Sequence, residues 1–106
     1  MEQREYVRRL LESYRTTPGT CGVVRRSDRL LAIQLHERGM PLEAVENALT
    51  LAAARRLARP ADAPPLGVVR SLAYFSPVID EVMHLKVSPE YFRHLRNRIA
   101  KFTPAP

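Results

Sequence analysis

Cysteine is almost missing from this chain, which has only Cys21 among its 106 residues. A single thiol cannot form an internal disulfide, and no nearby histidine pairs with it, so an inert reduced thiol is the favoured interpretation. No apolar run approaches the roughly 20 residues that span a bilayer. The charged N-terminus also lacks the apolar stretch of a signal peptide. These absences predict a cytoplasmic protein with no membrane partner.

Residue patterns typical of catalysis are also missing. The three histidines, at His36, His84 and His94, lack metal-ligand spacing relative to one another. Asp80 and Glu81 are adjacent, so on a helix their side chains would point about 100 degrees apart and could not act as a close pair. No glycine-rich phosphate loop occurs among the four glycines. The sequence therefore predicts a protein that is not an enzyme and has no cofactor or metal.

Positive charge is abundant, with a formal net charge of +6. Arginine supplies nearly all of it, at 15 residues against two lysines. The planar guanidinium binds phosphate through two parallel hydrogen bonds and stacks on bases better than an ammonium does. A high-GC genome produces the same bias without any function, and both explanations stay open. The charge bears on partners and not on fold.

Apolar residues recur at helical spacing through most of the chain and no strand is evident, which predicts an all-α fold. We expect one compact domain of five or six helices over residues 1–102, followed by a frayed tail at 103–106. A proline-rich linker follows residue 60, because residues before proline avoid the helical region. An apolar stripe over 68–82 continues through Pro77 and predicts two nearly continuous helical segments, and Ser88 is expected to start the last helix.

The stretch from Ser27 to Pro60 has the outline of a helix-turn-helix. Ser27 is expected to cap the first helix, Gly39 to end it, and Pro41 to lie in the first turn of the second. In a DNA-binding helix-turn-helix the second helix enters the major groove. That placement would bring Asn47 to a base edge, where it could read adenine. An ordinary helical hairpin in the core explains the same residues, and this alternative stays open.

Two groups of basic residues are candidates for phosphate contact. One surrounds the start of the second helix, where backbone N–H groups favour an anion, and consists of Arg25, Arg26 and Arg29. Another lies on the last helix, interleaved with Tyr91 and His94, and consists of Arg93, Arg96 and Lys101. Arginine among aromatics is typical of phosphate contact with base stacking on single strands or RNA. The arginines at the end of the second helix, Arg55, Arg56 and Arg59, are explained instead as a complement to the negative end of that helix.

The run LxxxGMPLEAVENALTLAAARR, followed after the linker by VRSLAYFSPVIDEV, resembles small helical proteins of bacterial mobile elements. It is also loosely similar to helical domains of replication-initiation proteins of the DnaD kind. The matching positions are Gly39, Val45, Ala48 and Leu49 in the first part and Tyr74, Phe75, Ile79 and Glu81 in the second. The resemblance covers residues 30–82 and implies DNA-associated work in replication or transposition, as an accessory subunit.

The leading hypothesis is a non-catalytic accessory protein that binds nucleic acid, DNA in preference to RNA. The alternative is an adaptor that docks on a larger protein partner through a surface patch of Tyr74, Phe75 and Met83. The favoured interpretation of these three residues is that they fill the core of a small domain, because apolar stripes are generally buried. Arginines that converge on one face would favour the first hypothesis. An exposed Phe75 beside Met83, with dispersed arginines, would favour the second.

Overall fold

The computed structural model describes residues 1–84 and 89–102, which form five α-helices and one short 3-10 helix. The elements in chain order are α1 (Gln3–Thr16), α2 (Arg26–Glu37), α3 (Leu42–Leu57), η1 (Leu72–Phe75), α4 (Ser76–His84) and α5 (Pro89–Phe102). Within those two ranges the only β-type pairing is an isolated bridge. The predicted all-α fold of five or six helices is confirmed.

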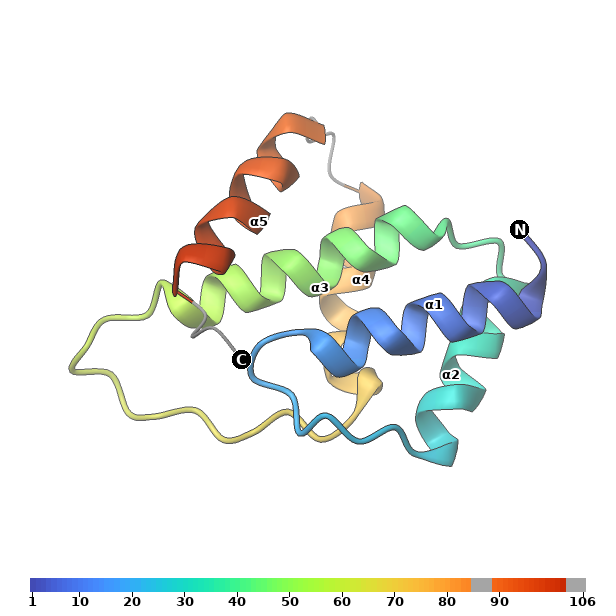
Figure 1. Cartoon of the computed structure of the whole chain (residues 1–106), viewed down its shortest axis with the longest axis horizontal. Coiled ribbons are helices and arrows are strands. Elements are labelled where there is room, and N and C mark those ends of the chain that lie inside the picture. The colour runs from blue at the N-terminus through green and yellow to red at the C-terminus, as the bar shows by residue number, and fades with distance from the viewer. Residues whose placement is uncertain (85–88, 103–106) are drawn as a thin grey trace.

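α3 is the central helix, and α1, α4, α5 and η1 all pack against it (Figure 1). Its buried side chains do not form one stripe but surround much of the helix: Leu42, Val45, Ala48, Leu49, Leu51, Ala52 and Ala53. A helix that is apolar on several sides belongs to a core, whereas a surface helix has one apolar face. α3 is therefore shielded by its neighbours.

The helix-turn-helix is not confirmed as a unit, although its turn is present. Gly39 takes the left-handed conformation with φ of 74°, and the Met40 N–H closes the turn by donating to the Leu35 carbonyl at 3.0 Å. Beyond this turn, α2 packs on α1 and η1 and makes little contact with α3 (Figure 1). The reason is that α1 packs against both helices. Its apolar face occupies the position in which α2 and α3 would otherwise contact each other.

The start of α2 corrects the prediction that Ser27 is the cap. The helix begins two residues earlier than this cap implies, at Arg26, so Ser27 lies inside it. Asp28 performs the capping role instead, since its Oδ2 accepts the Arg25 N–H at 2.8 Å. Its other oxygen, Oδ1, accepts the N–H of Leu72 at 2.8 Å, 44 residues further along the chain. Asp28 is only 1% exposed, and it joins the start of α2 to the start of η1.

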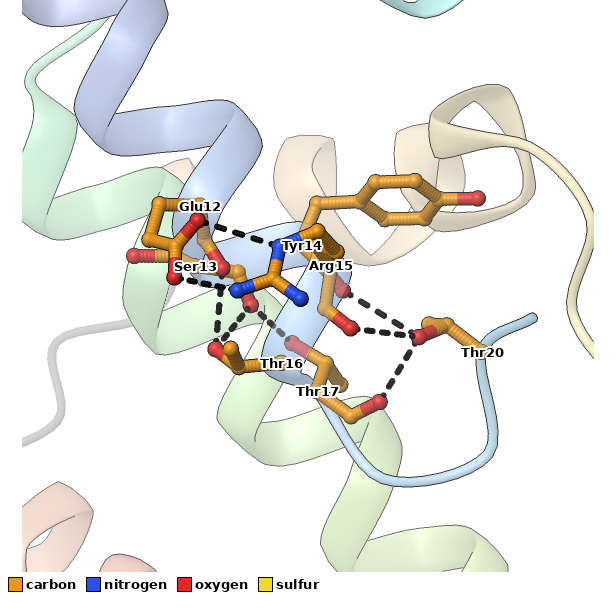
Figure 2. Close-up of polar contacts among 7 residues, drawn as sticks. All are labelled: Glu12, Ser13, Tyr14, Arg15, Thr16, Thr17 and Thr20. Atoms are coloured by element: carbon orange, nitrogen blue, oxygen red, sulfur yellow. Dashed lines mark hydrogen bonds and ion pairs between the residues drawn. The ribbon is translucent and has the colours of Figure 1, made fainter. Parts of the chain in front are cut away.

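Figure 2 shows how three threonines close the end of α1. The Thr17 hydroxyl donates to the Ser13 carbonyl at 2.6 Å, and the Thr16 hydroxyl donates to the Glu12 carbonyl at 2.9 Å. The Thr20 hydroxyl donates to the Thr17 carbonyl at 2.9 Å. Such side-chain bonds satisfy the carbonyls that a helix end leaves unpaired. They also hold the loop after α1 close to its helix.

The linker between α3 and η1 returns along the edge of the molecule and pairs with that same loop (Figure 1). The Val69 N–H donates to the Gly19 carbonyl at 2.8 Å, and the Cys21 N–H donates to the Val69 carbonyl at 2.9 Å. Because Val69 is held in this bridge, the helical stripe does not begin at Val68 as predicted but at Leu72. η1 and α4 then follow without a gap, which confirms the two nearly continuous segments.

α5 forms an outer layer on α3 and is anchored to the core by Phe92 and Leu95 (Figure 1). Ser88, the predicted start of this helix, and the predicted tail at 103–106 lie outside the described residues. α5 thus presents its remaining surface away from the core.

Candidate nucleic-acid interface

α5 carries the densest run of positive charge in the chain. Residues 91–101 include four cations and no acidic residue. All four side chains are exposed, and together they define the α5 basic face: Arg93, Arg96, Arg98 and Lys101. Arg93, Asn97 and Lys101 follow one another at a spacing of four and form a row opposite Phe92 and Leu95. Arg96 and Arg98 lie on either side of this row, each at a different cleft.

Two predicted nucleic-acid-binding residues from separate parts of the sequence, Asn47 and Arg96, are in contact beside this face. The Arg96 guanidinium donates a hydrogen bond to the side-chain oxygen of Asn47 on α3. Next to it, the Ser13 hydroxyl of α1 donates to the Glu46 carboxylate at 2.6 Å. α1 and α5 therefore flank the side of α3 that a recognition helix would present, and leave between them only an open cleft of about 350 Å³. In this arrangement the side-chain oxygen of Asn47 accepts a hydrogen bond from Arg96, and a role for Asn47 at a base edge stays a prediction.

The predicted cluster at the start of α2 is far from α5. Arg25, Arg26 and Arg29 are exposed and form no ion pair with another residue in the described ranges. Figure 1 places the start of α2 and α5 at opposite sides of the molecule. These two clusters therefore do not converge on one face.

Arginines do converge at the C-terminal end of α3, where the sequence indicated only a complement to the helix dipole. They line an open cleft of about 360 Å³, whose apolar surface comes from Ala52, Leu66, Pro77 and Val78. The polar side chains of this cleft are Arg55, Arg56, Arg59 and Tyr74. We call it the arginine–tyrosine cleft.

Arg55 is the one cleft arginine whose charge is balanced by a described carboxylate. It forms a double hydrogen bond with Glu81 of α4, with the Nη1 atom 2.7 Å from Oε2. The hydrogen bond lowers the pKa of the Glu81 carboxyl and raises the pKa of the Arg55 guanidinium. This pair ties α3 to α4 beside the cleft.

Among the residues that the structure describes, Arg56 and Arg59 have neutral partners only. Arg56 donates to the Gly67 carbonyl at 2.8 Å and to the Tyr74 hydroxyl at 3.3 Å, and its Cζ lies 5.8 Å from the centre of the Tyr74 ring. Arg59 donates to the Pro64 carbonyl at 2.8 Å. Both side chains are half-buried, and neither forms an ion pair within the described part of the chain. The cleft is therefore electropositive.

Another open cleft, of about 340 Å³, lies next to the arginine–tyrosine cleft, on the other side of Arg55. It lies between α3 and α5 and is lined by Arg55 together with Tyr91, Leu95 and Arg98. Arg55 lines both clefts. Of the α5 cations, Arg98 therefore lies near the arginine–tyrosine cleft, with Arg55 between them.

The aromatic patch expected for a docking adaptor is not assembled at the surface. Tyr74 and Met83 are exposed, but Phe75 is only 1% exposed. Its ring packs edge-on against Tyr14 with 6.1 Å between ring centres. Phe75 is thus a core residue that supports Tyr74 from below.

Groups of His, Cys, Asp and Glu that could hold a metal ion are not found in residues 1–84 and 89–102. No helix in the same ranges is long and apolar enough to cross a membrane. Comparison with models of protein families, with curated proteins and with solved structures gave no match. The resemblance to mobile-element and DnaD-like proteins therefore stays a prediction.

Proposed function

We propose that this protein binds nucleic acid without catalysing a reaction, by placing phosphates against the α5 basic face. The observation that carries the proposal is the run of four exposed cations with no acidic residue over 91–101. Phe92 and Leu95 hold the opposite side of α5 in the core. The cations therefore extend from a helix that is already ordered, which reduces the entropy lost on binding.

The physical basis of such binding is the release of counterions from the phosphates. The logarithm of the affinity falls linearly with the logarithm of the salt concentration. Each phosphate that an arginine or lysine neutralises adds about 0.9 to this slope for duplex DNA and about 0.7 for single strands. Guanidinium groups also bind phosphate through two parallel hydrogen bonds, which adds geometry to charge. The α5 basic face can supply several such contacts along its length.

The wider role in this proposal is that of a cytoplasmic accessory protein, with DNA preferred to RNA. Its assignment to replication or to mobile elements is supported by the sequence resemblance alone. The alternative of an adaptor in a larger nucleoprotein complex shares the basic surface. It lacks the exposed Phe75 on which its docking patch depended.

The test is fluorescence anisotropy with labelled duplex DNA, single-stranded DNA and RNA over a range of salt concentrations. Arg93→Ala/Lys101→Ala removes two charges from the α5 basic face, and Arg4→Ala/Arg8→Ala removes two from exposed positions on α1. We expect the α5 variant to lose about tenfold or more in affinity and to reduce the salt slope by about two. Equal losses in both variants, or salt-independent binding by the unmodified protein, would refute the proposal.

A further inference from the structure

We infer that the arginine–tyrosine cleft receives a base and its phosphate from single-stranded nucleic acid. This inference rests on the proposed function and adds to it a second site and a class of ligand. The α5 basic face supplies charge along the backbone, whereas the cleft supplies an aromatic surface together with cations. The shape and chemistry of the cleft point to a nucleotide within a strand.

The cleft combines an apolar surface with two uncompensated charges. Leu66, Pro77 and Val78 supply apolar atoms in a space of about 360 Å³, a size that falls in the usual range for small-molecule sites. Arg56 and Arg59 are half-buried and have only carbonyl and hydroxyl partners among the described residues. A ligand that is flat and apolar in one part and anionic in another matches both features.

Tyr74 is held ready to stack on such a ligand. Its ring is 47% exposed, yet its orientation is restricted from two sides. Phe75 packs edge-on against it with 5.2 Å between ring centres, and Arg56 contacts both its hydroxyl and its ring. Because Phe75 is buried in the core, the Tyr74 ring loses little further freedom when a base stacks on it. Base–aromatic stacking tolerates every base, since all have a flat π-face.

The guanidinium groups have donors left for a phosphate. An arginine carries five N–H donors, of which Arg59 uses one on the Pro64 carbonyl and Arg56 uses two on Gly67 and Tyr74. The bond to Tyr74 holds the Arg56 guanidinium at the cleft without neutralising it, and the bond to Pro64 leaves the charge of Arg59 uncompensated. A phosphate would provide the charge-assisted hydrogen bonds that carbonyl groups do not.

The requirement for a free base selects single strands. In a duplex the bases are stacked and paired, and removing one from the stack costs a few kcal/mol. A duplex would thus reach the α5 basic face through its phosphates but would leave the cleft empty. A single strand can use both sites, because Arg55 lines the arginine–tyrosine cleft and also the neighbouring cleft between α3 and α5.

The test compares Tyr74→Leu with Tyr74→Phe, using labelled oligothymidylate of about 12 nucleotides and a duplex of the same length. We expect Tyr74→Leu to weaken oligothymidylate binding roughly 5- to 150-fold, the equivalent of about 1–3 kcal/mol of stacking. Tyr74→Phe keeps the ring face, so its affinity should stay within about twofold of the unmodified protein. Duplex affinity should be the same for all three proteins.

A crosslinking experiment keeps the inference testable if Tyr74→Leu fails to fold. Oligothymidylate with one 5-iodouracil is irradiated with the unmodified protein, which is then digested with trypsin. Cleavage after Arg70 releases residues 71–86, in which Tyr74 is the only tyrosine. A crosslink on this peptide, at Tyr74, supports the inference, whereas crosslinks confined to α5 peptides overturn it.

The outcomes separate this inference from the proposed function. If Tyr74→Leu binds the single strand normally, or loses duplex and single-strand affinity equally, the cleft inference fails. If Arg93→Ala/Lys101→Ala lowers the affinity for both probes in that case, the proposed function stands although the cleft inference has failed. If the unmodified protein binds neither probe in a salt-dependent way, both are refuted.

Discussion

Residues 25–29 and 55–59 contain the same arginine spacing, Arg-Arg-x-x-Arg, yet the structure uses the two segments in opposite ways. At the start of α2 the guanidinium groups are exposed, and a buried carboxylate, Asp28, forms the structural hydrogen bonds. At the end of α3 the arginines themselves bond to the linker, to Tyr74 and to Glu81. The first segment is thus held by an acidic residue of its own, whereas the arginines of the second segment hold neighbouring elements in place.

This difference follows from the polarity of a helix. A helix start has unpaired N–H groups, for which an acidic side chain is the natural partner, and residue 28 supplies one. A helix end has unpaired carbonyls and faces a returning chain, for which cations are the natural partners. Arginine spacing alone therefore does not distinguish a surface cluster from a structural one. The neighbouring elements decide, and the comparison can be tested by substitution.

The largest expected effect is on stability, from Asp28→Ala. This change removes the acceptor for the N–H groups of Arg25 and Leu72, which are left unpaired beside a buried site. We expect the free energy of unfolding to fall by about 2–4 kcal/mol, measured by urea denaturation. Asp80→Ala is the control, since Asp80 is exposed and lies 3.9 Å from Arg38, and it should change stability by less than about 1 kcal/mol. Equal effects would show that Asp28 does not anchor α2.

Arg56→Ala should have the next largest effect. It removes the hydrogen bonds to Gly67 and Tyr74 that hold the linker against α3. Because the side chain is only half-buried, we expect a loss of about 1–2 kcal/mol in thermal or urea unfolding. The matched substitution at the start of α2, Arg26→Ala, should change stability by less than about 0.5 kcal/mol. A larger loss for Arg26→Ala would reverse the comparison.

Tyr14 provides a pH-dependent prediction for the core next to Asp28. Its hydroxyl is buried without a hydrogen-bond partner among the described residues. Burial, helped by the Asp28 carboxylate and Cys21, raises the pKa of Tyr14 to about 12 from the usual value of 10.0. The folded protein therefore holds the Tyr14 proton more tightly than the unfolded chain does. This difference adds to the free energy of unfolding in full below pH 10, and the addition is lost as the pH rises toward 12.

Tyr14→Phe tests this assignment, since it removes the hydroxyl and keeps the ring. At neutral pH its stability should stay within about 1 kcal/mol of the unmodified protein, because the hydroxyl forms no bond that would be lost. In thermal unfolding at successive pH values, the variant should show a smaller decline above pH 10. An undiminished decline would assign the alkaline transition to other groups.

The smallest expected effect is that of Arg25→Ala/Arg29→Ala on nucleic-acid binding. Figure 1 places the start of α2 on the far side from α5, so only long-range attraction is lost, and salt screens such attraction beyond about 10 Å. We expect affinity for either probe to stay within about threefold at physiological salt, measured by anisotropy. If this variant instead lost more affinity than Arg93→Ala/Lys101→Ala, the phosphate contacts would belong at α2.

Much of the secondary structure could be predicted because it depends on local features. Gly39 ends α2 with a positive φ, as expected from capping geometry, and Pro77 lies in the first turn of α4, as expected from proline geometry. Ser27 was a wrong prediction for a related reason. Both Ser27 and Asp28 are suitable caps in isolation, and the distant N–H of Leu72 favours Asp28.

The candidate site was predicted only in part. The amphipathic pattern of α5 placed Arg93, Arg96 and Lys101 on an exposed face, because one apolar stripe leaves the other positions to solvent. The partnership of Arg96 with Asn47 spans 49 residues of sequence, and no local pattern contains it. The arginine–tyrosine cleft was missed, since it exists only when the linker brings Leu66 and Tyr74 back to the end of α3.

By itself the sequence determined the helices, the turn at Gly39 and the charge of the helix surfaces, because these depend on interactions within a few residues. The tertiary structure decided which face of α3 is covered, and hence that the predicted helix-turn-helix is not an exposed reading unit. It also decided which arginines are committed to the fold and which stay exposed. Both outcomes depend on contacts between segments that are distant in the sequence. Burial determines which of several locally similar side chains becomes part of such a contact.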